Sequence, residues 1–321
     1  MIDRQFLLAQ ANSTGFRPEV LEKVYHLLTL LNELCQHPFL KDRFALKGGT
    51  ALNLFLFSLP RLSVDIDLNY IGAISRDEML KDRPQVEAAI EAVCQRANFQ
   101  IRRVPNEHAG GKWLLRYQSA LGQMGNLHID INFLLRLPLW PIIYLDSCSL
   151  GTYQAKQVPV LDPHELIAGK LAALFSRNAT RDLFDAYQLI SYTSLEKEKL
   201  RLAFIIYGAI NRKDWRTVSI NDLAFSLQDL ESQLLPLLST SYRATLGQTS
   251  NWGQNILLAC QQHFNFWPLD AREQEFLDLL LDQGQIVPQL ITQDQNLINL
   301  LPNHPGLLWK ALNVKNFRGL K

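Results

Sequence analysis

The sequence has almost no excess charge of either sign. Its 32 lysines and arginines nearly balance 31 aspartates and glutamates, which leaves a formal net charge of +1. Proteins that coat nucleic acid usually carry a broad electropositive field, so the composition excludes that class. If a polynucleotide binds to this chain, it must bind through a local basic patch.

Cysteine is scarce, and long apolar runs are missing. The four cysteines are widely spaced and form no C-x-x-C pattern: Cys35, Cys94, Cys148 and Cys260. This spacing argues against the usual zinc and dithiol motifs and favours reduced thiols in a cytoplasmic protein. Polar residues follow the first residues closely, and no run of 18 apolar residues occurs. We therefore expect neither a signal peptide nor a membrane span.

The order of the periodic segments predicts an α+β fold with two domains. A mixed α/β domain with an N-terminal helix is expected over residues 1–155, and a mainly helical domain over 156–321. In the first domain we expect helices over 18–35, 50–59 and 84–97 and strands over 63–70, 112–119 and 127–133. In the second, Asp162-Pro163-His164-Glu165 is a helix start, with aspartate as the cap and proline in the first turn.

The two best strands carry acidic residues on one face. Residues 63–70 and 127–133 alternate between apolar and polar side chains, as half-buried strands do. Asp65 and Asp67 are two positions apart and therefore project from the same face. Two carboxylates this close repel each other unless a cation lies between them. With Asp130 on a neighbouring strand, they predict a site for two metal ions, Mg²⁺ or Mn²⁺, in phosphoryl transfer. Alternatively, such a pair is simply a solvated strand face.

A glycine pair precedes the acidic strand. The amides of Gly48 and Gly49 at the start of a helix can approach a phosphate closely, and the helix dipole favours its negative charge. Thr50 adds a hydroxyl, and Lys47 adds a positive charge. Taken alone, this tripeptide is more often an ordinary turn.

Three ordered blocks of sequence resemble a known family. Lys47-Gly-Gly-Thr-Ala-Leu52 is followed by Arg61-Leu-Ser-Val-Asp-Ile-Asp-Leu68, and later by Lys170-Leu-Ala-Ala173 and Arg181-Asp-Leu-Phe-Asp185. These blocks resemble the GG/GS-T-A-L, R-x-S-x-D-I-D-L and K-L-x-A with R-D-x-x-D motifs of the AbiEii/AbiGii and MenT-like nucleotidyltransferase toxins. The resemblance implies a nucleotidyltransferase-type mixed sheet in the first domain and a helical second domain that completes the cleft.

The third block also has a physical interpretation of its own. Lys170 and Arg177 are seven residues apart on one helix, so both point to the same side. Asp182 and Asp185 lie three apart on the next helix, where one of them can orient Lys170. The alternative is a ladder of structural salt bridges between two packed helices. For Lys170, the family resemblance favours a functional role.

Together, these residues predict a metal-dependent nucleotidyltransferase that uses an NTP. The metal ligands are expected to be Asp65, Asp67 and Asp130, and the catalytic set adds Lys170 and Asp185. Asp130 is also a candidate base for the attacking hydroxyl. The remaining nucleotide-binding candidates are Lys47, Gly48, Gly49, Thr50, Ser63, Arg177 and Asp182.

The resemblance further implies that the acceptor is RNA, with the tRNA 3′ end as the leading candidate, and that a cognate antitoxin exists. A protein or small-molecule acceptor, a γ-phosphoryl transferase and an idle nucleotide-binding module are the alternatives. RNA would require one of several basic runs as a phosphate track, unless these are solvated surface. The three runs are Arg102, Arg103, Lys112 and Arg116 beside the predicted strands, then Arg212, Lys213 and Arg216, and finally Lys310, Lys315, Arg318 and Lys321. The scattered tryptophans are expected in the core or at its edge.

Overall fold

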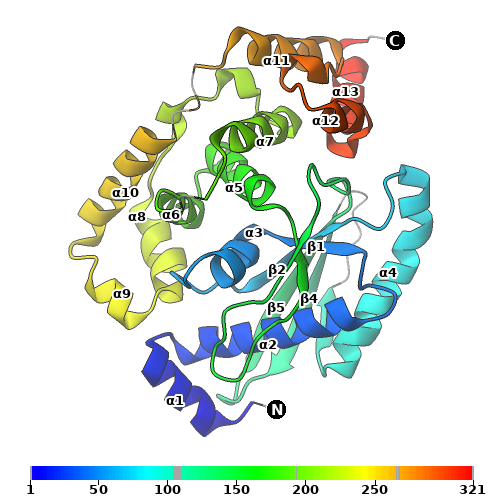
Figure 1. The fold of residues 1–321 in the computed structure, drawn as a ribbon. Coiled ribbons are helices and arrows are strands. Elements are labelled where there is room, and N and C mark those ends of the chain that lie inside the picture. The colour runs from blue at the N-terminus through cyan, green and yellow to red at the C-terminus, as the bar shows by residue number, and fades with distance from the viewer. Residues whose placement is uncertain (1, 104–109, 193, 265, 267, 320–321) are drawn as a thin grey trace. The chain divides into compact units, whose positions relative to one another are not determined.

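The computed structural model describes residues 2–103, 110–192, 194–264, 266 and 268–319, and the chain divides into two compact units (Figure 1). Unit 1 comprises Met1–Arg136, Pro141–Leu161 and Leu230–Gln248. Unit 2 comprises Leu137–Trp140, Asp162–Asp229 and Thr249–Lys321. Apart from the short segment Leu137–Trp140, the chain stays in unit 1 until Leu161, a few residues after the boundary expected at residue 155, and it returns to unit 1 for Leu230–Gln248.

Unit 1 contains a mixed β-sheet with helices packed against it (Figure 1). Its elements in chain order are α1 (Arg4–Thr14), α2 (Pro18–Gln36), β1 (Phe44–Lys47), α3 (Gly48–Ala51), η1 (Leu52–Leu56), β2 (Asp65–Tyr70), α4 (Arg76–Arg96), β3 (Gln100–Arg103), β4 (Gly110–Gln118), β5 (Met124–Asn132), β6 (Ile143–Leu145), β7 (Val158–Val160), η4 (Leu230–Leu234), η5 (Leu235–Leu237) and α9 (Thr240–Ala244).

The sheet brings the two predicted acidic strands side by side at its centre. Among the described residues its order is β3-β4-β5-β2-β1-β7-β6. β2 pairs with β5 in parallel and with β1 in antiparallel fashion. The residues between the polar positions are buried, including Ile66, Leu68, Ile129 and Ile131. The alternation predicted from the sequence is confirmed for the acidic positions, which are partly exposed, but Asn69, expected on the polar face, is buried.

The helix predicted over 18–35 is confirmed as α2, but the start predicted at Pro84 is wrong. α4 begins at Arg76, where the hydroxyl of the preceding Ser75 accepts a hydrogen bond from the Glu78 amide at 3.3 Å. Pro84 lies inside this helix rather than in its first turn. The prediction fails because proline is favoured in a first turn and usually breaks a helix interior. The helix expected over 50–59 starts earlier, at Gly48, and ends at Leu56.

Unit 2 is helical. Its elements are α5 (Pro163–Arg177), α6 (Thr180–Leu189), α7 (Lys197–Ile210), η2 (Trp215–Thr217), η3 (Ile220–Asp222), α8 (Leu227–Asp229), α10 (Thr249–His263), α11 (Ala271–Gln283), η6 (Pro288–Leu290), α12 (Gln295–Leu300), η7 (Leu301–Asn303) and α13 (Pro305–Arg318). The predicted start of α5 is confirmed, because the Asp162 carboxylate accepts from the His164 amide at 2.9 Å. The α+β class is confirmed as well. Within the part of the chain that the structure describes, no helix has both the length and the apolar composition needed to cross a bilayer.

Replacing Leu46 by alanine tests the central position of β1. Leu46 is fully buried between β2 and β7, so its truncation should lower the free energy of unfolding by about 2–5 kcal/mol. Leu80→Ala is the control, because Leu80 is 39% exposed on α4 and should change stability by only about 0.5 kcal/mol. Urea unfolding of both variants measures the difference. Equal losses would contradict the position of β1 inside the sheet.

Candidate active site

Four charged residues form a row across the sheet of unit 1. The strand register pairs Lys47 with Asp67, Asp67 with Asp130, and Asp130 with Lys112. Side chains of directly paired residues lie on the same face of a sheet. The sequence therefore folds so that two neighbouring carboxylates lie between two lysines. This brings together Lys47, Asp67 and Asp130, three of the residues that the sequence predicts for one site.

Asp65 lies on the same face as Asp67 and pairs with a histidine. The register sets Asp65 opposite His128 on β5. Its Oδ1 atom is 3.0 Å from Nδ1 of His128, and about a third of each side chain is exposed. From the sequence alone, His128 is only a polar neighbour of Asp130. Its contact with Asp65 is not predictable there because it depends on the parallel register of β2 and β5, which no local pattern encodes.

Gly48 has a backbone conformation that other residues rarely adopt. Its φ angle is 72°, in the left-handed region. A Cβ atom at this position would also overlap the carboxylate of Asp67. The glycine therefore allows the turn between β1 and α3 and leaves room for the Asp67 side chain. A glycine at this position is explained by both requirements together.

Thr50 and Ser63 hold the start of β2 from inside the protein. Both side chains are buried, and their hydroxyl oxygens are 3.0 Å apart. The Thr50 hydroxyl also donates a hydrogen bond to the backbone carbonyl of Asp65. This geometry gives the two residues a positioning role at Asp65. A direct contact of either hydroxyl with a nucleotide stays a prediction.

Burial and the neighbouring carboxylates shift the pKa of Lys47 in opposite directions. Burial lowers the pKa of Lys47, and the negative charges of Asp67 and Asp130 raise it in part. The net shift is downward. Burial therefore disfavours the charged form of Lys47, and its two acidic neighbours offset part of that effect.

The residues of the third sequence block meet in unit 2. The Lys170 ammonium of α5 is 2.8 Å from Oδ1 of Asp182 and 2.8 Å from Oδ2 of Asp185, both on α6. Nε of Arg177 is 2.7 Å from the other carboxylate oxygen of Asp182. Lys170 and Arg177 thus share one carboxylate, which confirms that they lie on the same side of their helix.

These four charges differ sharply in exposure. Lys170 is 8% exposed and Asp185 is fully buried, whereas the side chain of Arg177 is 65% exposed. Burial raises the pKa of Asp182, but Lys170 and Arg177 outweigh that effect and bring the pKa below its usual value. Asp182 is therefore a stable anion that joins a buried cation to a solvent-facing one.

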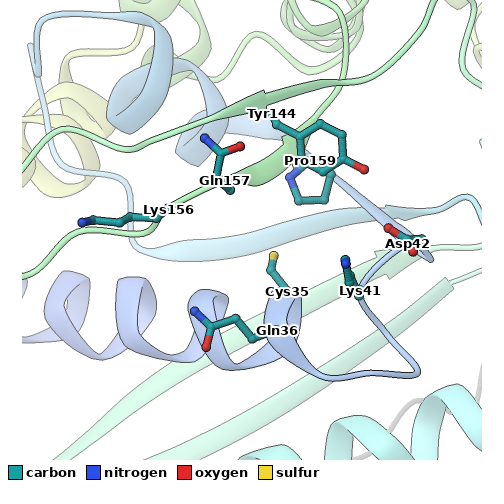
Figure 2. A pocket seen from close by; sticks show the side chains of 8 residues that line it. All are labelled: Cys35, Gln36, Lys41, Asp42, Tyr144, Lys156, Gln157 and Pro159. Carbon is teal, nitrogen blue, oxygen red and sulfur yellow. The ribbon is translucent and has the colours of Figure 1, made fainter.

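A separate groove opens in unit 1 away from the charged row. Its volume is about 740 Å³, and Figure 2 shows Cys35 and Gln36 of α2 on one side of it and Tyr144 of β6 on the other. The remaining lining residues are Lys41, Asp42, Lys156, Gln157 and Pro159. Lys41 and Asp42 precede β1, whereas Gly48 follows it, so the groove lies at the opposite end of that strand. None of the predicted site residues lines it.

Comparison with known proteins places the chain in a family. The family described as the nucleotidyl transferase AbiEii toxin of the type IV toxin-antitoxin system matches residues 29–251, which is more than half of the chain. The chain belongs to the AbiEii family of nucleotidyltransferase toxins. Its fold is similar to that of MenT4, a nucleotidyltransferase toxin from Mycobacterium tuberculosis H37Rv, with a TM-score of 0.62 and 19% identity. That similarity covers 96% of this chain and 99% of MenT4. Among curated protein sequences, none matches the chain.

Membership in the AbiEii family confirms the resemblance based on the three sequence blocks, all of which lie inside the matched range. It makes the protein a toxin of the nucleotidyltransferase type, with an NTP as substrate and a cognate antitoxin. In this AbiEii-family chain, the first two blocks contribute Lys47 and Asp67 to the charged row of unit 1. The third block contributes Lys170, Asp182 and Asp185, which with Arg177 form the Lys170 cluster of unit 2.

The carboxylates of the AbiEii-family chain suit a metal ion that the substrate helps to bind. Among the residues described, no group of three or more histidine, cysteine, aspartate or glutamate side chains is close enough to hold a metal by itself. The expected cage of Asp65, Asp67 and Asp130 is therefore not preformed. Mg²⁺, however, is usually bound by one or two carboxylates together with substrate phosphates and waters. The adjacent pair Asp67 and Asp130 matches that requirement.

Gly48→Ala should damage both stability and activity. Alanine would be strained at the positive φ angle of this position, and its Cβ atom would displace the Asp67 carboxylate. Gly247→Ala is the matched control, because Gly247 has a φ of 62° but a Cβ added there would meet nothing within 4 Å. The control should lose about 1–2 kcal/mol of stability from backbone strain alone, with normal nucleotidyl transfer. Urea unfolding and a transfer assay compare the two. Equal behaviour would contradict the coupling of Gly48 to Asp67.

Proposed function

We propose that this toxin transfers a nucleotide monophosphate from an NTP to an RNA acceptor and thereby blocks translation, with the tRNA 3′ end as the leading acceptor. The observation that carries the proposal is the row Lys47, Asp67 and Asp130 beside the backbone turn at Gly48. Such a row combines negative ligands for a metal ion with a cation and amides for phosphate. The RNA acceptor is what the resemblance of the sequence blocks implies.

The nucleotide phosphates are assigned to the turn between β1 and α3. The amides of Gly48 and Gly49 begin a helix, where the dipole favours negative charge. Lys47 precedes this turn and adds a basic group to it. Its neighbours Asp67 and Asp130 favour the charged form of that group. Thr50 and Ser63 support the site by fixing the backbone of Asp65.

Asp65, Asp67 and Asp130 are the proposed ligands of Mg²⁺ or Mn²⁺. When bound, the metal would polarise the α-phosphoryl group and neutralise charge on the phosphates. Asp130 is the candidate base that accepts the proton of the acceptor hydroxyl. The acceptor oxygen then forms a bond to the α-phosphorus, and the bond to the leaving pyrophosphate breaks.

Lys170 and Arg177 of unit 2 are proposed to supply positive charge for the triphosphate. Arg177 is the solvent-facing cation of the cluster, whereas Lys170 contacts Asp182 and Asp185. Lys170 therefore acts on a phosphate either by displacing one carboxylate or by fixing Asp182, which in turn orients Arg177. Asp185, which is fully buried against Lys170, helps to hold the lysine in place before substrate binds.

Replacing Asp67 by asparagine tests the proposed reaction. The change keeps the shape of the side chain but removes the negative charge next to Asp130, so transfer should fall by about 100-fold or more. The assay contains Mg²⁺, each labelled NTP and total RNA, and it measures labelled RNA and pyrophosphate. Addition of a metal chelator should abolish transfer by the unaltered protein.

Asp42→Asn is the control, because Asp42 is an exposed carboxylate of unit 1 outside the charged row. Full activity of Asp67→Asn would refute the metal assignment. Release of a nucleoside diphosphate instead of pyrophosphate would identify a phosphotransferase, and nucleotide binding without turnover would identify an idle binding module.

Lys170→Met separates a functional role from a structural one. The substitution leaves Asp182 and Asp185 buried without their shared cation, so stability should fall by about 3–5 kcal/mol. The variant Lys170→Met/Asp185→Asn also removes the Asp185 charge while Asp182 keeps its contact with Arg177, and it should regain most of that stability. It should not regain transfer activity if the ammonium group serves the reaction. Recovery of both stability and transfer would show that the cluster is only structural.

A further inference from the structure

The fold gathers two distant basic runs around one groove in unit 2. The groove has a volume of about 410 Å³, and its walls come from the segment after α7 and from α11 and α13. The lining residues are Arg212, Asp214, Arg216, Leu281, Trp309, Lys310, Asn313, Val314, Phe317 and Arg318. Four of these side chains are cationic and one is anionic. Asp278 and Asp282, which pair with Arg216 and Arg318, add two carboxylates beside the groove, so the positive charges exceed the negative ones only slightly.

Three of the four cations contact acidic or carbonyl groups of the same unit. Arg216 is 2.7 Å from Asp214 and 2.6 Å from Asp282, and Arg318 is 2.6 Å from the other oxygen of Asp282. Lys310 donates a hydrogen bond to the carbonyl of Asn211 at 2.6 Å. These contacts fix the cations on the groove wall. Arg212, by contrast, is exposed at the groove, so it is the member best placed to meet a ligand.

Two aromatic side chains of α13 line the same groove. Phe317 is 90% exposed, the highest value among the exposed large hydrophobic residues of the described chain, and Trp309 lies two turns earlier on the helix. The residues that the structure describes cover little of this phenylalanine. Aromatic rings beside arginines are the features with which proteins bind single-stranded nucleic acids, because bases stack on the rings and phosphates pair with the cations.

We propose that this groove binds a single-stranded segment of the acceptor RNA, with a base on Phe317 and phosphates on Arg212 and its cationic neighbours. This proposal rests on the proposed function, since it adds a binding site for the RNA that function requires. A single-stranded segment fits better than a duplex, because bases that stack on aromatic rings must first be unstacked from each other. The charged lining favours RNA over a protein partner, because the buried centre of protein interfaces is depleted in charge.

RNA binding without NTP tests the groove separately from the chemistry. The probe is a fluorescein-labelled, single-stranded oligoribonucleotide of about 12 nucleotides, within the ordinary range of site sizes. Its affinity for the full chain is measured by fluorescence anisotropy. Phe317→Ser should weaken binding by about tenfold, because stacking on one base is worth roughly 1–3 kcal/mol. Arg212→Ser should lower the slope of log K against log salt by about 0.7.

Two control variants remove an exposed apolar side chain and an exposed cation elsewhere in unit 2. Leu312→Ser replaces another exposed apolar residue of α13, which is 58% exposed and does not line the groove. Lys197→Ser removes an exposed cation at the start of α7. Both should bind the probe as the unaltered chain does.

The outcomes for binding and for chemistry are distinguishable. Asp67→Asn should keep full affinity for the probe, and Phe317→Ser should lower kcat/KM for RNA while leaving kcat at saturating RNA unchanged. If Phe317→Ser and Arg212→Ser bind the probe as well as the controls do, the groove proposal is overturned, even if transfer to RNA is observed. It is also overturned if Phe317→Ser leaves RNA binding intact but changes the sedimentation of the protein, because the groove would then be a protein interface.

Discussion

The candidate site depends on repulsion between two carboxylates that the sheet forces together. Asp67 and Asp130 are paired residues of adjacent parallel strands, and like charges in that arrangement destabilise a sheet. Lys47 and Lys112 flank the pair at the two ends of the row and offset part of that cost. The offset is incomplete at Lys47, where burial opposes the charged form. A divalent cation with a bound polyphosphate would complete the balance, so the arrangement is complementary to the substrate complex rather than to the empty protein.

The turn at Gly48 is needed to accommodate the same Asp67 carboxylate. Without a Cβ atom, the backbone takes up a left-handed conformation and lets the Asp67 carboxylate lie against it. On the other side of the turn, Thr50 bonds to the backbone of Asp65 and so fixes where β2 begins. The loop proposed for phosphate and the strand proposed for metal are therefore built as one unit. The glycine block and the acidic block of the sequence are separate in the chain, but the structure makes each depend on the other.

The central strands and the first long helix could be predicted from the sequence, because their signals lie in local patterns of apolar residues. Period-two alternation located β2 and β5, and helical spacing located α2. Features that depend on contacts between distant residues, or on a residue with two possible roles, could not be predicted. Pro84 indicated a helix start because nothing in its neighbourhood showed that Ser75 caps the helix earlier. His128 was not linked to Asp65 because strand register is set by the whole sheet. The meeting of Arg212 and Phe317 at one groove likewise depends on tertiary packing of segments about a hundred residues apart.

The Lys170 cluster is difficult to explain by stability alone. Removing charges from water is costly, and replacing a buried ion pair with apolar side chains is often neutral or stabilising. A helix pair built only for packing would not require a lysine between two buried carboxylates. The cluster is also formally neutral, since Lys170 and Arg177 balance Asp182 and Asp185. Its net charge would therefore not attract a triphosphate, and any attraction must come from the position of Arg177, the member that faces solvent. In the proposed function, these buried charges hold the exposed guanidinium of Arg177 in place.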